Sequence, residues 1–123
     1  MTVFASKLRV SNLANPERSE ELELMIDTGA SYSWLKRNRL EALGIRPTGR
    51  MQFRTIEGRL IEREIAPVLV SVDGKTGGDT VVIADPDDSE VWGAHTLEAM
   101  GLAADPVQKR LVPTVGLALT AAE

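Results

Sequence analysis

The sequence feature that most constrains the fold is an alternation of polar and apolar residues that runs directly into a tight turn. Along residues 21–26, every second residue is Leu or Ile, which gives an extended segment one apolar and one polar face. The segment ends in Asp27-Thr28-Gly29-Ala30, where the glycine permits a sharp turn. The pattern therefore predicts a β-strand that delivers one carboxylate to a loop.

The rest of the chain reads as mostly β with two short helices. Its 123 residues are 43% apolar, enough for one packed core, so residues 1–123 are expected to form a single domain. Helices are predicted over 37–43 and 96–100, each followed by a glycine that suits a helix end. Gly77-Gly78 is interpreted as a flexible turn. Strands are predicted over 3–10, 21–26, 51–56, 59–65, 68–72 and 80–84, with 111–112 and 115–119 as further candidates.

Charge and residue usage exclude several classes of function. The net charge is −4, and the basic residues are scattered, so nucleic acid is not an expected partner. The chain has no cysteine, which excludes disulfides and thiolate metal sites. The N-terminus does not resemble a signal peptide, and no apolar run reaches the roughly 20 residues of a membrane helix. A cytoplasmic protein without a membrane partner, metal or cofactor is expected.

The turn after the predicted strand carries residues suited to acid–base chemistry. Two nearby carboxylates can share one proton, so that one activates water while the other protonates a substrate. Thr28 offers a hydroxyl that can support the loop, Gly29 allows close backbone approach, and Ala30 leaves room for a substrate or a second chain. The competing interpretation is an ordinary Asp-Thr-Gly turn.

Several segments together resemble the retropepsin-like aspartic proteases, in particular small single-domain prokaryotic members. The resemblance rests on residues 25–31, on a hairpin with Gly58 near its tip, and on Val91-Trp92-Gly93 followed by residues 96–102. Residues 104–107 and 111–113 add to it. The resemblance implies a closed β-barrel of the acid protease fold.

The resemblance also implies roles for individual residues. Asp27 would be catalytic, Thr28 would brace the loop, and Gly29 would contact the substrate backbone beside Ala30. The flap over the cleft would be the hairpin tip, and an apolar segment would thread beside the catalytic loop. The predicted flap residues are Ile56, Glu57 and Gly58, and the predicted cleft-adjacent residues are Val91, Trp92 and Gly93.

One departure from the resemblance concerns a charge pair. Viral relatives have an Asp shortly after the motif and an Arg after the late glycine, whereas Ser31 and Ala94 stand here. Because both charges are missing together, no unpaired charge remains. The departure bears on specificity and dimer strength more than on the fold.

The motif occurs once, and a dyad needs two Asp residues. The sequence therefore predicts a symmetric homodimer with Asp27 of each subunit on the two-fold axis, and residues 115–119 as an intersubunit strand or a frayed end. The predicted function is an aspartic endopeptidase acting on peptide or protein substrates. The alternative is a non-catalytic peptide-binding or dimerisation module of the same fold, and a weaker third is an unrelated β domain with an accidental motif.

Two other clusters favour structural interpretations. The acidic loop around Asp85 and Asp88 lacks the spacing of an EF-hand and is interpreted as solvated. His95 is the only histidine, and nothing in the sequence places it beside Ser31 or Ser33 as a catalytic triad would require, so a surface or helix-start position is expected.

Overall fold

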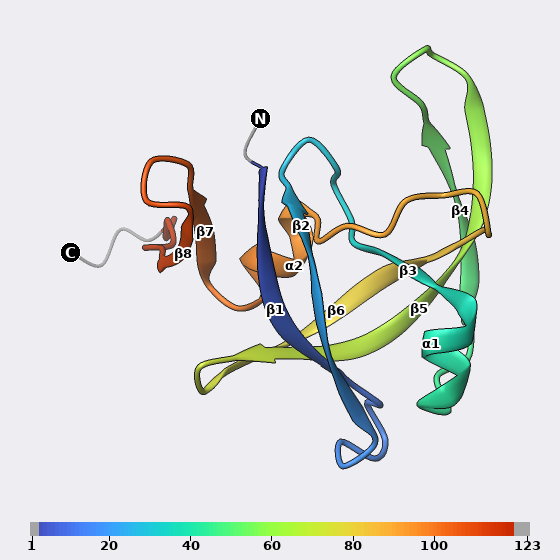
Figure 1. The fold of residues 1–123 in the computed structure, drawn as a ribbon, viewed down its shortest axis with the longest axis horizontal. Coiled ribbons are helices and arrows are strands. Elements are labelled where there is room, and N and C mark those ends of the chain that lie inside the picture. Colours follow the sequence, from blue (N-terminus) through green and yellow to red (C-terminus); the bar gives the residue numbers. More distant parts are fainter. Residues whose placement is uncertain (1–2, 120–123) are drawn as a thin grey trace.

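The computed structural model describes residues 3–119, which form mostly β-strands with two six-residue helices (Figure 1). The ends of the predicted 1–123 domain, residues 1–2 and 120–123, lie outside the described residues. The elements are β1 (Val3–Ser11), β2 (Ser19–Asp27), β3 (Trp34–Lys36), α1 (Arg37–Ala42), β4 (Gly49–Arg54), β5 (Leu60–Val72), β6 (Lys75–Ala84), α2 (Ala94–Ala99), β7 (Leu102–Asp105) and β8 (Arg110–Pro113).

Six strands form one sheet in the order β2-β1-β5-β6-β3, with β4 paired to β5. Strands β1 and β2 form an antiparallel hairpin whose register pairs Val3 with Asp27, so the motif lies at the open end of this hairpin. Strands β7 and β8 form a separate two-stranded sheet. In Figure 1 this small sheet lies on the side of the C-terminal segment, whereas the β4–β5 hairpin extends from the opposite side of the molecule.

Strand β5 replaces two predicted strands, 59–65 and 68–72, with one continuous strand. The two predicted strands do not include residues 66 and 67, whereas in the structure Ala66 pairs with Val81 and Pro67 with Thr80 of β6. In the structure β5 pairs with β4 through Ile65 and with β1 from Leu69 onward. Pro67 lies between these two stretches, so its missing N–H interrupts neither ladder.

The prediction of a flexible turn at Gly77-Gly78 is wrong. Both glycines lie inside β6, where they pair with Val70 and Leu69 of β5. A Cβ on Gly77 would lie 2.1 Å from the carbonyl oxygen of Ala99, so helix α2 packs directly on this backbone. The missing side chain therefore serves close packing of helix on strand, a reason that the local sequence does not reveal.

The predicted closed β-barrel is not formed in the described part of the chain, because the sheet ends at β2 on one side and β3 on the other. A two-residue segment lies between these outer strands and makes single bridges to them. Trp92 bridges Ile26 of β2, and Val91 bridges Trp34 of β3. The sheet is thus curved enough to bring its outer strands to one short segment without a continuous ladder.

The core lies inside this curved sheet and is covered by α2. Its fully buried members include Leu8, Ile26, Leu35 and Trp92. Both helices end as predicted, at glycines with left-handed φ angles of 73° for Gly44 and 71° for Gly101. Residues 115–119, a candidate strand, carry no regular secondary structure, and residues 102–105 form a strand that the sequence did not predict.

Candidate active site

Asp27 is the last residue of β2, and its carboxylate is held by the turn that follows. The backbone N–H of Gly29 donates to Asp27 Oδ1 at 2.9 Å, and the N–H of Ala30 donates to the Asp27 carbonyl at 3.0 Å. A Cβ on Gly29 would lie 3.1 Å from the same carboxylate oxygen and would crowd it. Asp27 and Ala30 are half-buried and Thr28 and Gly29 are exposed, so the carboxylate is fixed and still faces solvent.

The segment containing Trp92 holds the backbone of the motif from the other side. The N–H of Asp27 donates to the Trp92 carbonyl at 2.9 Å, and the N–H of Trp92 donates to the Met25 carbonyl at 2.9 Å. The indole Nε1 of the fully buried Trp92 donates to the carbonyl of Ser6 in β1 at 3.0 Å. A tryptophan here therefore joins β1, β2 and the motif loop.

Gly93 is buried against the loop that follows the motif. A Cβ on Gly93 would lie 2.4 Å from the carbonyl carbon and oxygen of Tyr32 and 2.9 Å from the carbonyl oxygen of Ala30. Real Cβ atoms do not approach so closely, so no other residue fits without moving the loop. Trp92 and Gly93 thus contact the motif and its loop, whereas Val91 pairs with Trp34 of β3. Their predicted position beside a substrate cleft stays a prediction.

The first turn of α2 continues this support. The N–H of Ala94 donates to the Ala30 carbonyl at 2.9 Å, and the N–H of His95 donates to the Ser31 carbonyl at 2.8 Å. Ser31 and Ala94 replace the charge pair of viral relatives. Each makes a backbone hydrogen bond across the loop, Ser31 to His95 and Ala94 to Ala30. His95 is the second residue of α2, as expected from a helix-start position.

Sequence reasoning missed a buried polar network behind the loop. The Ser33 hydroxyl accepts from the Gly93 N–H at 2.9 Å and contacts the Thr96 hydroxyl. Thr96 donates to Asp79 Oδ2 at 2.6 Å, and His95 Nδ1 lies 2.7 Å from Asp79 Oδ1. No local sequence signal marks Asp79, because it follows the polar and glycine residues 75–78 of β6 and precedes Thr80. Its partners come from separate segments, and only the tertiary structure identifies them.

The β4–β5 hairpin, predicted to be the flap, is connected to the motif loop by aromatic rings. Phe53 of β4 lies 6.1 Å from the Tyr32 ring and 5.3 Å from the Trp34 ring, measured between centroids. At the tip Gly58 has a φ of 90°, and the Ile56 side chain is fully exposed. Glu57 is also exposed. The action of the tip on a substrate stays a prediction.

A comparison with protein-family models identifies the chain. The model described as "Aspartyl protease" matches residues 15–91, more than half of the chain. The chain belongs to this retropepsin-like aspartyl protease family. A search of curated proteins finds no match. The match contains Asp27 and the whole β4–β5 hairpin and ends immediately before Trp92, so the support from Trp92, Gly93 and α2 comes from the structure.

In this family member the β4–β5 hairpin is held by an ion pair as well as by aromatic contacts. Arg63 of β5 donates from Nε to Asp88 Oδ2 at 2.7 Å and from Nη2 to Asp88 Oδ1 at 3.1 Å, and its guanidinium lies 5.9 Å from the Trp34 ring centroid. These hydrogen bonds hold the pKa of Asp88 below its usual value. The acidic loop is therefore only partly solvated, since Asp88 is held by the hairpin.

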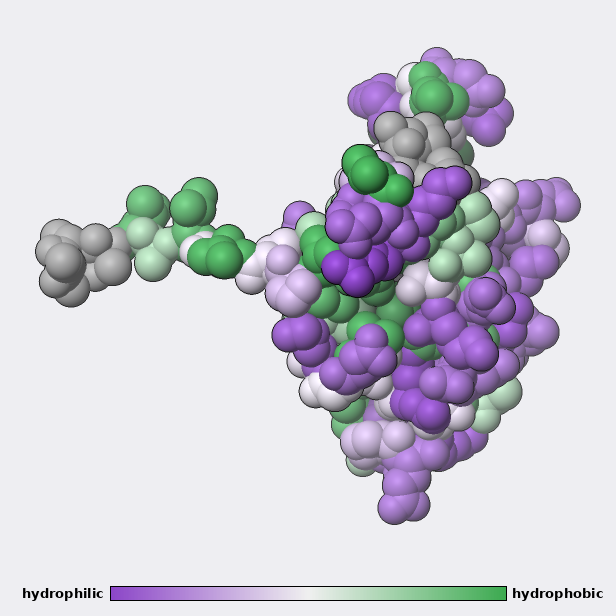
Figure 2. Space-filling view, turned by 60° about the vertical axis from the view of Figure 1, so that its left-hand side comes forward, coloured by the Kyte–Doolittle hydropathy of each residue, from purple (hydrophilic) through white to green (hydrophobic). Residues whose placement is uncertain are grey.

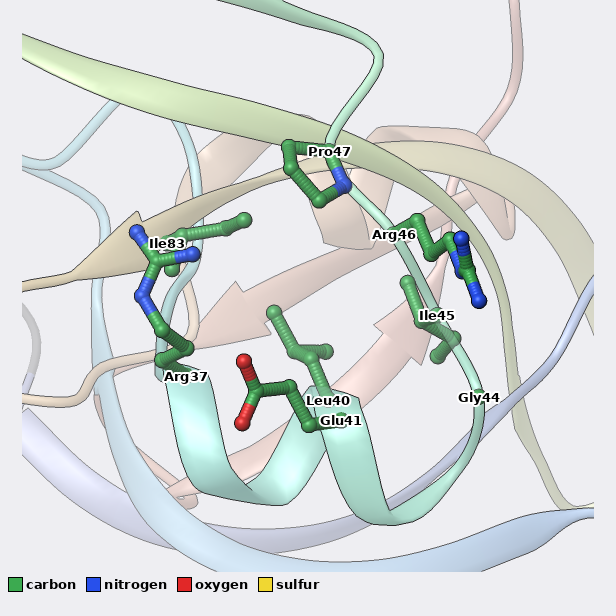
Figure 3. A pocket seen from close by; sticks show the side chains of 8 residues that line it. All are labelled: Arg37, Leu40, Glu41, Gly44, Ile45, Arg46, Pro47 and Ile83. Atoms are coloured by element: carbon green, nitrogen blue, oxygen red, sulfur yellow. The ribbon is translucent and has the colours of Figure 1, made fainter.

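Two cavities differ in their relation to the motif. One of about 570 Å³ begins at Thr28 and is lined mostly by apolar residues of α2 and β7, together with Thr114 and Gly116. Another, of about 340 Å³, lies between α1 and β6 and contains no predicted site residue; Figure 3 shows the Arg37 and Arg46 side chains on opposite sides of it. The first cavity is therefore the one adjacent to the candidate site.

Neither helix of the described residues is long and apolar enough to cross a membrane. Among residues 3–119, no three His, Asp or Glu side chains are grouped to bind a metal ion. The cytoplasmic location and the protein partners stay predictions.

Proposed function

We propose that this family member is an aspartic endopeptidase that hydrolyses peptide bonds as a homodimer, with Asp27 of each subunit forming one dyad. The observation that carries the proposal is the geometry of Asp27 itself. Its carboxylate accepts a hydrogen bond from the Gly29 N–H and stays half-exposed, and its backbone is fixed by Trp92. A rigid, accessible carboxylate is what activation of a water molecule requires.

The chemistry follows from two carboxylates that share one proton. The ionised carboxylate takes a proton from water while the water oxygen attacks the peptide carbonyl carbon. The protonated carboxylate gives its proton to the carbonyl oxygen, which avoids a free oxyanion. Collapse of the tetrahedral intermediate breaks the C–N bond, and the proton taken from water goes to the leaving amine. Gly29 leaves its side of the cleft open to an extended peptide backbone.

A second copy of the chain is the proposed source of the second carboxylate. The motif occurs once in the sequence, so one subunit supplies half of a dyad. Beside Thr28 lies the apolar cavity that reaches Thr114 and Gly116. Just beyond it, Val115, Leu117 and Leu119 are almost fully exposed. Figure 2 shows apolar side chains on an arm that extends from the body toward the C-terminus. An apolar groove and an apolar arm in one chain suit reciprocal burial in a symmetric dimer.

The β4–β5 hairpin is the proposed cover over the bound peptide. It extends from the body, ends in an exposed turn, and contacts Tyr32 of the motif loop and Trp34 of β3 through Phe53, which pairs with Ile61 one position before the turn. An attached hairpin with an exposed tip suits a segment that closes on an extended substrate. We therefore propose substrates that are unfolded or locally unstructured.

The direct test is cleavage of an unstructured protein between about pH 4 and pH 7, the range in which a shared-proton dyad works. We expect the wild-type protein to cleave it and Asp27→Asn to be inactive with an unchanged fold. Asp87→Asn is the matched control, because Asp87 is exposed and lies far along the chain from the motif. Cleavage activity that persists in Asp27→Asn would contradict the assignment of Asp27 as the catalytic residue. A folded dimer that binds peptide without cleaving it would support the alternative, a non-catalytic module.

Mixing subunits tests the dyad itself. If each active unit needs two Asp27 side chains, an equimolar mixture of wild-type and Asp27→Asn chains should keep about one quarter of the wild-type activity per total chain after exchange. A site contained in one chain would keep about one half. The mass in solution, measured across the same concentrations, should show a dimer wherever activity is present.

A further inference from the structure

We propose that Asp79 and His95 form a positioning pair that fixes the motif loop through Thr96, Ser33 and the backbone N–H of Gly93. This inference rests on the proposed function, because it assigns the pair a role in holding Asp27 for catalysis. The Asp79 and His95 side chains do not contact Asp27, although the His95 backbone N–H donates to the Ser31 carbonyl in the loop that follows it. Their influence passes along a chain of hydrogen bonds that the structure contains in full.

The direction of each hydrogen bond in this chain is determined by the groups present. The Gly93 N–H can only donate, and it donates to the Ser33 hydroxyl. The Thr96 hydroxyl donates its proton to Asp79 Oδ2, so its contact with Ser33 must be one in which Ser33 donates. Donation therefore runs from Gly93 through Ser33 and Thr96 to the Asp79 carboxylate, and each hydroxyl both donates and accepts.

Burial makes this arrangement hard to replace with water. Ser33 and Thr96 are fully buried, and the side chain of Asp79 has no exposed surface. A buried carboxylate is costly unless it is hydrogen-bonded and paired. Asp79 Oδ1 also accepts from the N–H of Thr80 at 2.9 Å, and His95 reaches the same oxygen with Nδ1. Because 46% of the His95 side chain is exposed, the imidazole connects this buried group to solvent.

The far end of the chain of hydrogen bonds lies at the motif. Gly93 packs against the carbonyl groups of Tyr32 and Ala30, and Trp92, which precedes it, accepts from the N–H of Asp27. His95 is tied to the same loop twice, since its N–H donates to the Ser31 carbonyl and its ring lies 5.1 Å from the Tyr32 ring. A shift of Asp79 would therefore move both the backbone beside Asp27 and the loop behind it.

The hydrogen-exchange rate of the Gly93 amide proton, measured by NMR, reports whether its hydrogen bond to Ser33 is stable. This measurement does not require protease activity. Ser33→Ala calibrates the probe, because it removes the acceptor of that proton. Asp79→Asn and Thr96→Val should each raise Gly93 exchange about tenfold while core amides of β5 keep their rates. Thr96→Ser retains a hydroxyl and should restore most of the protection. Asp87→Asn is the charge-matched control and should change nothing.

The proposal is overturned if Ser33→Ala raises Gly93 exchange but Asp79→Asn and Thr96→Val do not. It is also overturned if these variants raise the exchange of β5 amides in proportion, which would mean general destabilisation. If Asp79→Asn does not fold, the Gly93 exchange rate of Thr96→Val decides between these outcomes. His95→Ala, at a half-exposed position, is a third variant for the same measurement. Where cleavage is observed, the same variants should lower kcat more than they raise KM. If the protein cleaves no substrate but the variants show the expected exchange rates, the proposed function is refuted and the hydrogen-bond network is supported.

Discussion

The backbone N–H of Asp27 donates a 2.9 Å hydrogen bond to the carbonyl oxygen of Trp92. The family match ends one residue before Trp92, so the candidate catalytic residue is positioned by a segment just outside the matched range. Trp92 also reaches Ser6 of β1 through its indole N–H. The backbone of Trp92 thus bonds to β2 while its side chain bonds to β1, so one residue links both strands to the late segment of the chain.

Trp92→Phe should lower the free energy of unfolding by about 2–4 kcal/mol, since it removes packed volume and leaves the Ser6 carbonyl without its donor. Trp34→Phe is the matched control at a half-buried position, and we expect a loss below about 1.5 kcal/mol. Urea unfolding of both variants at one pH measures the difference. Equal losses would show that the buried indole hydrogen bond contributes little.

Gly93→Ala should destabilise the fold by about 2–3 kcal/mol, because the new methyl group would collide with the carbonyls of Tyr32 and Ala30. Gly78→Ala provides the control, since no atom lies within 4 Å of a Cβ at that strand position. There we expect a change within about 0.5 kcal/mol, or slight stabilisation. Thermal unfolding of the two alanine variants compares them. A well-tolerated Gly93→Ala would contradict the close approach.

Asp88→Asn should lower stability at pH 7 by about 1 kcal/mol, because it removes one charge from a two-pronged pair with Arg63. The pKa of Asp88 is lowered in the folded protein, so its contribution is complete above the unfolded pKa of about 3.9 and is lost as the pH falls through the lower folded value. The stability gap between wild type and variant should therefore close in acid. Urea midpoints from pH 7 down to pH 2 measure it, with Asp87→Asn as control. A gap independent of pH would contradict the ion pair.

Phe53→Ala should loosen the β4–β5 hairpin relative to the rest of the sheet, because its ring contacts both Tyr32 and Trp34. Hydrogen exchange should accelerate about tenfold at the hairpin while β1 and β2 keep their protection. Gln52→Ala, the exposed neighbour on the same strand, should leave exchange unchanged. If the hairpin amides of Phe53→Ala exchange at the wild-type rates, the aromatic contacts do not stabilise the hairpin.

Local sequence patterns predicted those parts of the fold whose physical cause lies within a few neighbouring residues. Alternation predicted β2 and delivered Asp27 to the loop, and Gly44 and Gly101 marked both helix ends because their left-handed φ angles favour glycine. Elsewhere the cause is tertiary. Strand β5 continues through Pro67 because β6 pairs with it on both sides of the proline, and position 77 of β6 is a glycine because Ala99 packs on its backbone.

The candidate site likewise has a part that the sequence predicts and a part that only the tertiary structure reveals. The Asp27 turn with Gly29 follows from consecutive residues, and sequence alone predicted it. Asp79, Ser33 and Thr96 belong to three separate segments, and none of their own neighbours indicates that they meet. The open sheet is a further case, because its outer strands meet residues 91–92 only through single bridges, which depend on contacts between distant segments and not on strand pattern.

The dependence of Asp27 on Trp92 has a consequence for the order in which the molecule is made. The β1–β2 hairpin is local and can form early, whereas the contact with Trp92 closes a long loop and is slow by comparison. During translation a chain that has emerged as far as α1 already contains Asp27 and the Gly29 and Ala30 amides that bond to it, but it lacks Trp92, which accepts from the Asp27 N–H, and helix α2. We therefore expect a nascent chain on the ribosome to have no cleavage activity until α2 has been synthesised.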